Sequence, residues 1–414
     1  MKKETIFVQI AAYRDPELVP TLRDLFKNAA NPDNLRVCIA WQRDEVDTVE
    51  EFENDSRVTL LKINYKESKG ACWARNSIQQ HYKGETYTLQ LDSHHRFVKD
   101  WDIELIQMYK QLVAKGHKKP LITSYIPSYD PKNDPAGRVA VPWKMNFDRF
   151  IPEGAVFFLP ASIDNFKELN EPIPARFYSA HFAFTTGEFC KEVQHDPNYY
   201  FHGEEISIAV RAFTHGYDLF HPHKIIAWHE YTRQGRTKHW DDYNTWGELN
   251  AASHLRNRKL FGMDGLVNDI DFGKYGFGKV RTLRDYEKYS GLSFSKRSVQ
   301  QHTLDNKLAP NPDIYKTEEE WENSFTRVFK HCIDLDPKRV PEKDYEFWCV
   351  AFKDKDNQEI YRKDADKAEI ESITRSTDYY KVWRTFNCDR QPFKWVVWPY
   401  STSKGWCEAI EGTL

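Results

Sequence analysis

The segment LQLDSHHRF contains the residues whose types and spacing point most directly to chemistry. A run typical of a β-strand ends at Asp92 and is followed by Ser93 and His94. Side chains two residues apart on an extended chain point the same way, so Asp92 and His94 can converge on one divalent ion. A carboxylate suits Mg²⁺ or Mn²⁺, and the imidazole shifts the preference towards Mn²⁺. The alternative is that Asp92 caps the following turn and that His94 is a surface residue.

A third ligand for such an ion has to come from another strand. The apolar run IIAWH ends at His229, which is the best candidate. Taken alone, His229 is equally well explained as a hydrogen-bonded core histidine. Together with the first pair, it predicts a metal site made of Asp92, His94 and His229.

Two carboxylates follow a glycine in FHGEEISIAV, where Glu204 and Glu205 open an amphipathic helix after Gly203. Acids at a helix N-terminus are favoured by the helix dipole, which is a sufficient structural explanation. The functional alternative is that one carboxylate faces the substrate and orients a hydroxyl group or acts as a base. Both residues are therefore candidate catalytic groups.

A glycine turn also precedes a buried-looking helix in ESKGACWAR. This segment places Gly70 at the helix start and Arg75 about one turn inside. Free backbone N–H groups at a helix start, together with an arginine, can hold a diphosphate. The alternative is that Arg75 is a solvated helix residue.

These candidates need a scaffold, and the first 235 residues alternate short apolar runs with segments of helical period. This alternation predicts the α/β class with a mostly parallel sheet. The segment AAYRDPE stands where a GxGxxG would follow the first strand, so a dehydrogenase is not favoured. The expected strands are 5–11, 36–41, 58–63, 87–92, 121–126 and 225–230, and the expected helices are 20–26, 71–81 and 101–114.

The rest of the chain differs in composition. Residues 127–174 are rich in Pro, Asp and Asn, which predicts long loops that bind the acceptor at the carboxyl edge of the sheet. Residues 233–297 contain 13 Lys and Arg against 8 Asp and Glu, and we expect a mobile basic connector there. The last 75 or so residues contain β-rich runs such as YEFWCVAF. The predicted domains are 1–240, a basic connector with helices over 241–335, and a small β-rich domain over 336–414.

Composition excludes several classes of protein. The 414 residues include 59 Lys and Arg against 62 Asp and Glu, so no overall positive field draws the chain to nucleic acid. No apolar run approaches the ~18 residues of a membrane span, and we expect no signal peptide. The seven cysteines are scattered and never form CxxC, so neither a disulfide framework nor a zinc site is predicted. A cytoplasmic location fits these features best.

Four motifs in order resemble a known family. The segments FVQIAAYRDPELVPTLRDLF, SKGACWAR, LQLDSHHRF and GEEISIAVRAFTHGYDLFHP, the last followed by WHEYTR, are similar to cytoplasmic N-acetylglucosaminyltransferases that modify hydroxyproline. The resemblance extends more faintly to polypeptide N-acetylgalactosaminyltransferases. It covers about residues 5–235 and implies the GT-A fold, a UDP-sugar donor, Mn²⁺ and retention of anomeric configuration.

The resemblance also implies roles for individual residues. Asp92 and His94 match the DxH metal motif of the family, with Ser93 between them near the donor, and His229 matches its distal metal histidine. Glu204 matches the acid beside the donor sugar, whereas Glu205 and His95 are details of this chain. The remaining donor-binding matches are Ala11, Tyr13 and Arg14 near the uridine and Arg75 after the glycine turn.

The predicted function is therefore a metal-dependent transfer of a sugar, GlcNAc by resemblance, from a UDP-sugar to a hydroxyl of a protein or glycan. A second candidate acceptor is a hydroxymethylated base in DNA, for which the basic segment would supply the anion-binding patch. That patch contains Arg233, Arg236, Lys238, Arg256, Arg258, Lys259, Lys279, Arg281 and Arg284. Two different functions also fit these residues: a metal-dependent hydrolase, and a carbohydrate-binding protein on a degenerate GT-A fold whose C-terminal β domain does the binding.

Overall fold

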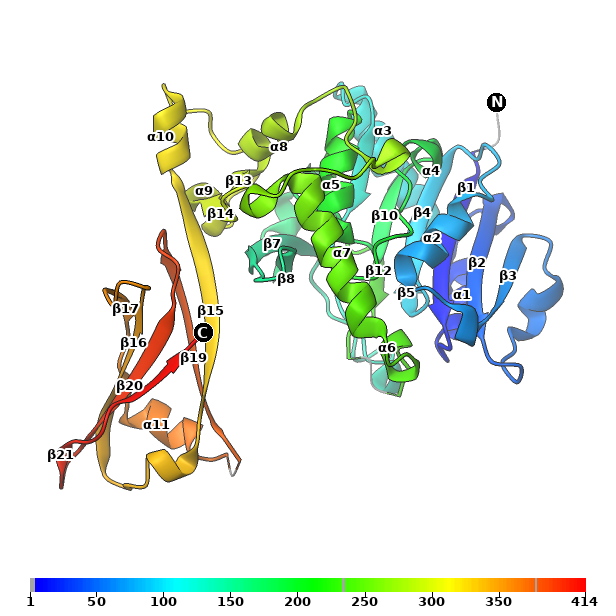
Figure 1. Cartoon of the computed structure of the whole chain (residues 1–414). Coiled ribbons are helices and arrows are strands. Elements are labelled where there is room, and N and C mark those ends of the chain that lie inside the picture. The colour runs from blue at the N-terminus through cyan, green and yellow to red at the C-terminus, as the bar shows by residue number, and fades with distance from the viewer. Residues whose placement is uncertain (1–3, 233–234, 377) are drawn as a thin grey trace. The chain divides into compact units, whose positions relative to one another are not determined.

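The structure is a computed structural model that describes residues 4–232, 235–376 and 378–414 (Figure 1). Its contacts divide the chain into two units. The first unit runs to Arg297 and includes His302–Lys316, and the second consists of Ser298–Gln301 and Thr317–Leu414. The two are described separately below.

The first unit is built around an eight-stranded mixed sheet. Its order is β3-β2-β1-β4-β10-β6-β11-β9. The strands β3, β2, β1 and β4 are parallel, whereas β10 is antiparallel to both of its neighbours. The α/β expectation is confirmed. The strands are β1 (Ile6–Tyr13), β2 (Leu35–Arg43), β3 (Val58–Asn64), β4 (Tyr87–Asp92), β6 (Pro120–Thr123), β9 (Ile173–Pro174), β10 (Phe182–Thr186) and β11 (Asp218–His221).

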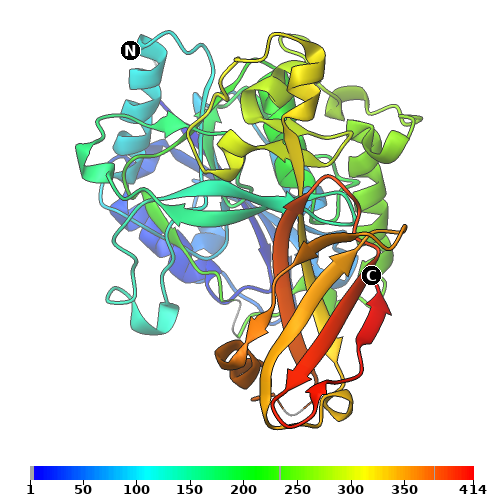
Figure 2. The same cartoon turned by 90° about the vertical axis from the view of Figure 1, so that its left-hand side faces the viewer.

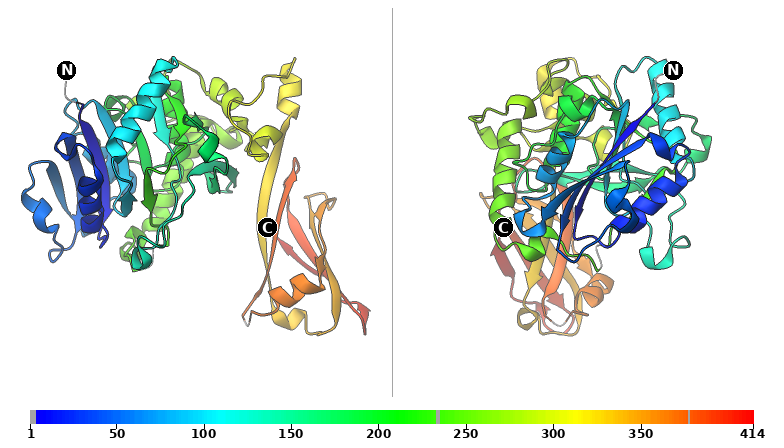
Figure 3. Two further views of the ribbon diagram at one scale, coloured as in Figure 1. Left: turned by 180° about the vertical axis from the view of Figure 1, so that it is seen from behind. Right: turned by 90° about the vertical axis from the view of Figure 1, so that its right-hand side faces the viewer.

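Helices cover both faces of this sheet (Figures 1 and 3). Because side chains alternate along a strand, Val8 and Ile10 pack in the core beneath α1 and α3, whereas Phe7 packs with α2 and α4 on the other face. A sheet covered in this way explains why its strands are apolar almost throughout. The helices are α1 (Leu18–Asn28), α2 (Ala71–Gln79), α3 (Trp101–Ala114), α4 (Phe189–Glu192), α5 (Glu204–Thr214), α6 (His239–Asp242), α7 (Trp246–Phe261), α8 (Leu283–Ser290) and α9 (Gln301–Leu304).

Short strands lie outside the main sheet, and one pair of them is in a segment that was expected to form loops. Residues 127–174 do not form loops alone, because they contain the antiparallel hairpin of β7 (Trp143–Phe150) and β8 (Val156–Ser162). Met145 and Phe147, two residues apart on β7, and Phe158 on β8 are buried. This alternation is typical of a half-buried strand, but the Pro and Asp content of the segment favoured the prediction of loops. A second ribbon pairs β5 (His95–Phe97) with β12 (Ala227–His229).

The structure also differs from the expected mobile basic connector. Residues 235–297 form helices that pack within the first unit, where Arg256 of α7 forms an ion pair with Asp196 and Tyr286 of α8 is fully buried. The positive charges expected to form a patch are largely paired with carboxylates, some close in the sequence and some, as for Arg256 and Arg281, about 60 residues away. Arg233 lies outside the described residues. The basic residues with ion pairs are Arg236, Lys238, Arg256, Arg258, Lys259, Arg281 and Arg284.

The second unit is a β-sandwich (Figure 2). Residues of both sheets, such as Phe386 of one and Phe352 of the other, pack in a common core. One sheet contains β14 (Ser298–Gln300), β15 (Phe325–Leu335) and β19 (Tyr380–Cys388). The other contains β16 (Tyr345–Lys353), β17 (Glu359–Arg362), β18 (Ala365–Asp366), β20 (Lys394–Ser401), β21 (Gly405–Trp406) and β22 (Ile410–Thr413), and the helices of the unit are α10 (Glu318–Asn323) and α11 (Lys367–Ile373). The short strand β13 (Leu292–Ser293) belongs to the first unit.

The boundary of this unit differs from the one expected near residue 335. Strand β15 precedes that point, yet it pairs with β19 from Arg327 opposite Cys388 to Leu335 opposite Tyr380. In the segment TEEEWENSFTRVFKHC, part of the region expected to be a connector with helices, only the first part forms α10 and the rest begins β15. The sequence pattern missed the strand because its burial comes from a partner about 50 residues later.

Removing the second unit at Lys316 is expected to leave nucleotide binding intact, because the strands and helices that carry the candidate site precede that residue. A chain that ends at residue 335 is expected to aggregate, since β15 would present an unpaired edge without β19. Size-exclusion chromatography and UDP titration of both truncations check this. Loss of UDP binding in a soluble, monomeric chain ending at Lys316 would contradict the division into units.

Two further features bear on the sequence expectations. Within the described ranges, no helix is both long and apolar enough to cross a membrane. All seven cysteines are free thiols, and burial raises the pKa of Cys38 to about 12.

Candidate active site

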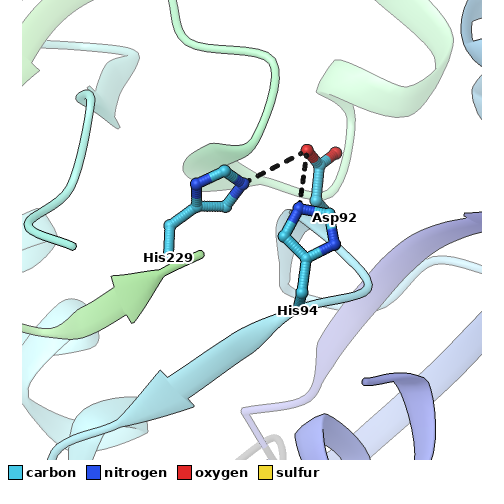
Figure 4. A group of neighbouring side chains, drawn as sticks. All are labelled: Asp92, His94 and His229. Atoms are coloured by element: carbon cyan, nitrogen blue, oxygen red, sulfur yellow. Dashed lines mark hydrogen bonds and ion pairs between the residues drawn. The ribbon is translucent and has the colours of Figure 1, made fainter. Parts of the chain in front are cut away.

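Three side chains from separate strand ends meet at the carboxyl edge of the sheet (Figure 4). Asp92 ends β4, His94 follows in the turn before β5, and the pairing of β5 with β12 places His229 opposite His95. The Nε2 atom of His229 lies 3.4 Å from Oδ2 of Asp92, and Nε2 of His94 lies 3.8 Å from the same oxygen. Their possible ligand atoms all lie within 4.8 Å of one another, so the three side chains can share one ion.

The protonation states of this group suit a metal ion. Burial lowers the pKa of His229 well below its ordinary value, so the ring is neutral and can offer a lone pair. Burial opposes ionisation of Asp92, but the hydrogen bond with His229 and the charge of Arg75 bring the pKa of that carboxyl well below its usual range. One carboxylate and two imidazoles match the preferences of Mn²⁺ better than those of Ca²⁺.

A second carboxylate contacts His94 at its other ring nitrogen, Nδ1. Asp15, in the loop after β1, lies 2.7 Å from Nδ1 of His94 and accepts a hydrogen bond of 2.7 Å from Oγ of Ser93. This contact fixes the ring so that Nε2 faces Asp92. Although burial raises the pKa of Asp15, the contacts with His94, Arg236 and Ser93 lower it overall. Sequence reasoning missed Asp15, for which the only signal was a carboxylate just beyond the end of the first strand.

Replacing Asp15 by Asn is expected to weaken Mn²⁺ binding by about 10- to 100-fold, which is the usual cost of losing a carboxylate behind a metal-binding histidine. The change keeps the side-chain volume but removes the charge that orients His94. Calorimetric titration with Mn²⁺ measures it. Asp33→Asn is the control, because the Asp33 side chain is 87% exposed in a surface turn and should leave the affinity unchanged. Equal affinities in all three proteins would contradict this role.

Arg75 is a buried part of the site and not a solvated helix residue. It projects from α2, with Nη2 2.9 Å from Oδ1 of Asp92 and Nη1 3.8 Å from Oε1 of Glu204. Gly70 precedes the helix at φ +101°, and a Cβ there would meet the ring of Tyr200 at 2.9 Å. The glycine therefore permits a close approach of the helix start to the aromatic wall of the pocket.

The paired glutamates at the start of α5 have different surroundings. Burial raises the pKa of both Glu204 and Glu205, and the negative charge of Glu205 raises that of Glu204 further. Glu205 is fixed by the protein, since Oε1 accepts a hydrogen bond of 2.9 Å from the backbone N–H of Ala180 and Oε2 accepts one of 2.8 Å from the hydroxyl of Tyr125. Glu204 instead faces Arg75. Of the two, Glu204 is the better placed to contact a substrate.

Two adjoining cavities open around these residues. The first is lined by Ala11, Tyr13, Gly70, Arg75 and Asp92, and closed by aromatic residues that sequence reasoning missed: Tyr200, Phe201, His239 and Trp240. Ser93 and His94 line its continuation towards His229. The run of aromatic residues in NYYF, before Gly203, could have indicated the first two of these side chains. Nothing in TKHW, which ends in the first two residues of α6, indicated the other two.

Arg14, predicted to lie near the uridine, contacts other residues of the protein. Its Nη1 is 2.9 Å from Oδ2 of Asp242, and its guanidinium stacks 4.4 Å from the centroid of Tyr65. The hydroxyl of Tyr13 donates a 2.7 Å hydrogen bond to the same carboxylate oxygen. Tyr13 and Arg14 thus tie α6 to the end of β1, and this link holds the aromatic wall over the first cavity.

The second cavity, of about 250 Å³, lies on the other side of Arg75 and Asp92. Glu204, Glu205 and His229 line it together with an aromatic surface, part of which comes from β8. The hairpin in residues 127–174 thus contributes to the site, as expected of that segment, although it does so as a strand. The aromatic lining residues are Tyr125, Phe157, Phe158, His181, Phe201, His202 and Tyr231.

Comparison of the sequence with family models finds a match to the family described as glycosyltransferase (GlcNAc). The match covers residues 5–52 and 45–296, which is most of the first unit. The chain belongs to this glycosyltransferase family. Its mixed sheet, with four parallel strands and the antiparallel β10, agrees with the GT-A expectation, which is confirmed for the first unit.

A search of solved structures finds several chains of low sequence identity. GalNAc-T7, solved with UDP, GalNAc and Mn²⁺, is 13% identical over 69% of this chain and 56% of that chain, with a TM-score of 0.49. S. aureus TarS 1–349 in complex with UDP-GlcNAc is 12% identical over 64% of this chain and 68% of that chain, with a TM-score of 0.39. This chain thus spans just over half of the GalNAc-T7 chain. No curated protein matches the sequence significantly.

Proposed function

We propose that this glycosyltransferase moves GlcNAc from UDP-GlcNAc to an acceptor hydroxyl and needs a divalent metal, Mn²⁺ or Mg²⁺, to do so. The observation that carries the proposal is the convergence of Asp92, His94 and His229 beside Arg75 in one cavity. The family description supports GlcNAc as the sugar. Anionic diphosphates and a buried arginine next to a metal-ligand set are complementary in charge.

Each part of the cavity has a role in this proposal. The aromatic wall of Tyr200, Phe201 and Trp240 stacks on the uracil, because every base presents a π-face to such rings. Arg75 donates hydrogen bonds to the leaving diphosphate, and Asp15 keeps His94 in the orientation that its metal-ligating nitrogen requires. A bound Mn²⁺ would supply the Lewis acid that neutralises the leaving group.

We further propose that the reaction retains the anomeric configuration. An inverting enzyme needs a free base on the far side of the sugar, and Glu205 is the alternative for that role. Both of its oxygens already accept hydrogen bonds from Tyr125 and Ala180, which favours a structural role. Glu204 then holds a hydroxyl of the donor sugar, and the acceptor attacks from the side of the leaving group.

The acceptor in this proposal is a hydroxyl of a protein, such as hydroxyproline, or of a glycan. The aromatic lining of the second cavity suits a neutral ring better than a phosphate backbone. Modified DNA is the weaker candidate, because the arginines and lysines that would attract it are largely engaged in ion pairs with carboxylates.

Release of UDP from UDP-GlcNAc, with and without an acceptor, tests the proposal. The acceptors are a hydroxyproline peptide, a GlcNAc-terminated oligosaccharide and a duplex containing hydroxymethylated bases. We expect acceptor-stimulated release with one of the first two, loss of release in EDTA, and slower release from UDP-glucose. Release that no acceptor stimulates indicates a hydrolase, and a response to the duplex alone would overturn the acceptor assignment.

A further inference from the structure

The outer face of one sheet in the second unit carries a cluster of aromatic rings. Side chains alternate along β16 and β20, so Trp348 and Val397 enter the core while Phe347, Trp398 and Tyr400 lie on the opposite face. The register places Phe347 opposite Tyr400, and β21 adds Trp406 beside β20. We call Phe347, Trp398, Tyr400 and Trp406 the aromatic platform; its strands can be followed in Figure 2.

The platform rings pack on one another and still face solvent. The ring centroids of Trp398 and Trp406 are 4.4 Å apart, and those of Phe347 and Tyr400 are 5.3 Å apart at 11° between planes. Trp398 is 41% exposed and Trp406 is 47% exposed. The indole N–H of Trp398 donates a 2.8 Å hydrogen bond to the carbonyl of Cys407, which fixes the orientation of that ring.

Nearby charges favour a neutral partner. Lys394 pairs with Glu411 at 3.1 Å, Lys404 with Glu342 at 2.5 Å, and Arg362 with Asp364 at 2.8 Å. These pairs neutralise charges on the strands and turn that carry the platform.

The size of the platform argues against a second protein chain. Its exposed ring surface is on the order of 300 Å², given the area that aromatic side chains can bury. A stable protein interface needs about 800 Å² from each partner. Sugar rings are of the right size, and their C–H groups carry partial positive charge that suits the negative face of an aromatic ring.

We propose that the aromatic platform is a binding site for a neutral glycan, separate from the site of transfer. Pyranose rings stack on Trp398 and Trp406, and Phe347 and Tyr400 each pack edge to face against Trp406 at 5.4 Å. The proposal does not depend on which sugar the first unit transfers, since no residue of the metal or donor site takes part.

An array of neutral and anionic oligosaccharides probed with the full-length protein tests this proposal, with chitohexaose also titrated in solution by calorimetry. We expect neutral glycans to bind and the Trp398→Ala/Trp406→Ala variant to lose at least 10-fold in affinity. Trp398→Phe/Trp406→Phe should retain most of the binding, because a ring face remains. Trp383→Ala is the control, since Trp383 is 54% exposed on the other sheet.

Three results would overturn the proposal. They are binding of no neutral glycan, equal binding by the platform variant and the wild type, or a dimer that only the platform variant disrupts. UDP binding is measured on the same variants. Because the UDP site is proposed for the first unit, a loss of UDP binding would count against the proposed function and not against the glycan site. Single Trp406→Ala, which leaves the hydrogen bond of Trp398 to Cys407 intact, guards against misfolding of the double variant.

Discussion

Asp92→Asn is expected to lower sugar transfer by about 1,000-fold, the upper range for losing a major electrostatic group in an active site. The carboxylate is the one anionic member of the metal-ligand group and also the partner of Arg75, at 2.9 Å. The amide keeps the shape but cannot neutralise either cation. Steady-state release of UDP, together with Mn²⁺ affinity, measures the effect.

Asp102→Asn is the matched control for this substitution. Asp102 is a buried carboxylate, 2% exposed, in the first turn of α3, and it accepts hydrogen bonds from the backbone N–H groups of Ala30 and Asn31. We expect this control to lose thermal stability without losing Mn²⁺ affinity. If Asp92→Asn retains both transfer and Mn²⁺ affinity, the metal site has been assigned to the wrong residues.

Glu204→Gln is expected to reduce transfer by about 100-fold while UDP affinity changes little, because Glu204 lies beyond the first cavity, towards the position of the sugar. The loss should appear in kcat more than in the apparent affinity for the donor. Single-turnover kinetics with UDP-GlcNAc separates these two quantities.

Glu205→Gln provides the comparison within the same helix turn. Its amide can still accept one of the two hydrogen bonds from Ala180 and Tyr125, so we expect a milder loss of transfer and a lower melting temperature. A larger loss of transfer at Glu205 than at Glu204 would reverse the two roles and favour an inverting base. Full activity in Glu204→Gln would leave only the helix-dipole explanation for that residue.

The sequence predicted the metal-ligand group because its signal is local. Asp92 and His94 are two residues apart at a strand end, and His229 ends another apolar run. Asp92 lies at the carboxyl end of a parallel strand, and the antiparallel pairing of β5 with β12 brings His229 beside it. The six strands expected in the first unit match β1, β2, β3, β4, β6 and β12 to within three residues at each end, since a sheet covered on both faces produces continuous apolar runs. The strands β9, β10 and β11 of the main sheet were not predicted.

What the sequence could not reveal depends on contacts between distant segments. Asp15 is 79 residues from His94, and no local pattern indicates that contact. The aromatic wall over the first cavity needs α6, which is held by Asp242 against Tyr13, 229 residues away. The basic segment was misread for the same reason, because the carboxylates that neutralise Arg256 and Arg281 lie in other elements.

Calorimetric titration of the wild-type protein with UDP, first with Mn²⁺ and then in EDTA, tests the central claim most directly. If Asp92, His94 and His229 hold an ion that contacts the diphosphate, each ligand completes the coordination of the other. The account predicts that UDP affinity falls by at least 10-fold in EDTA and that Mn²⁺ affinity rises to the same extent when UDP is present. UDP affinity that is the same with Mn²⁺ and with EDTA would contradict it.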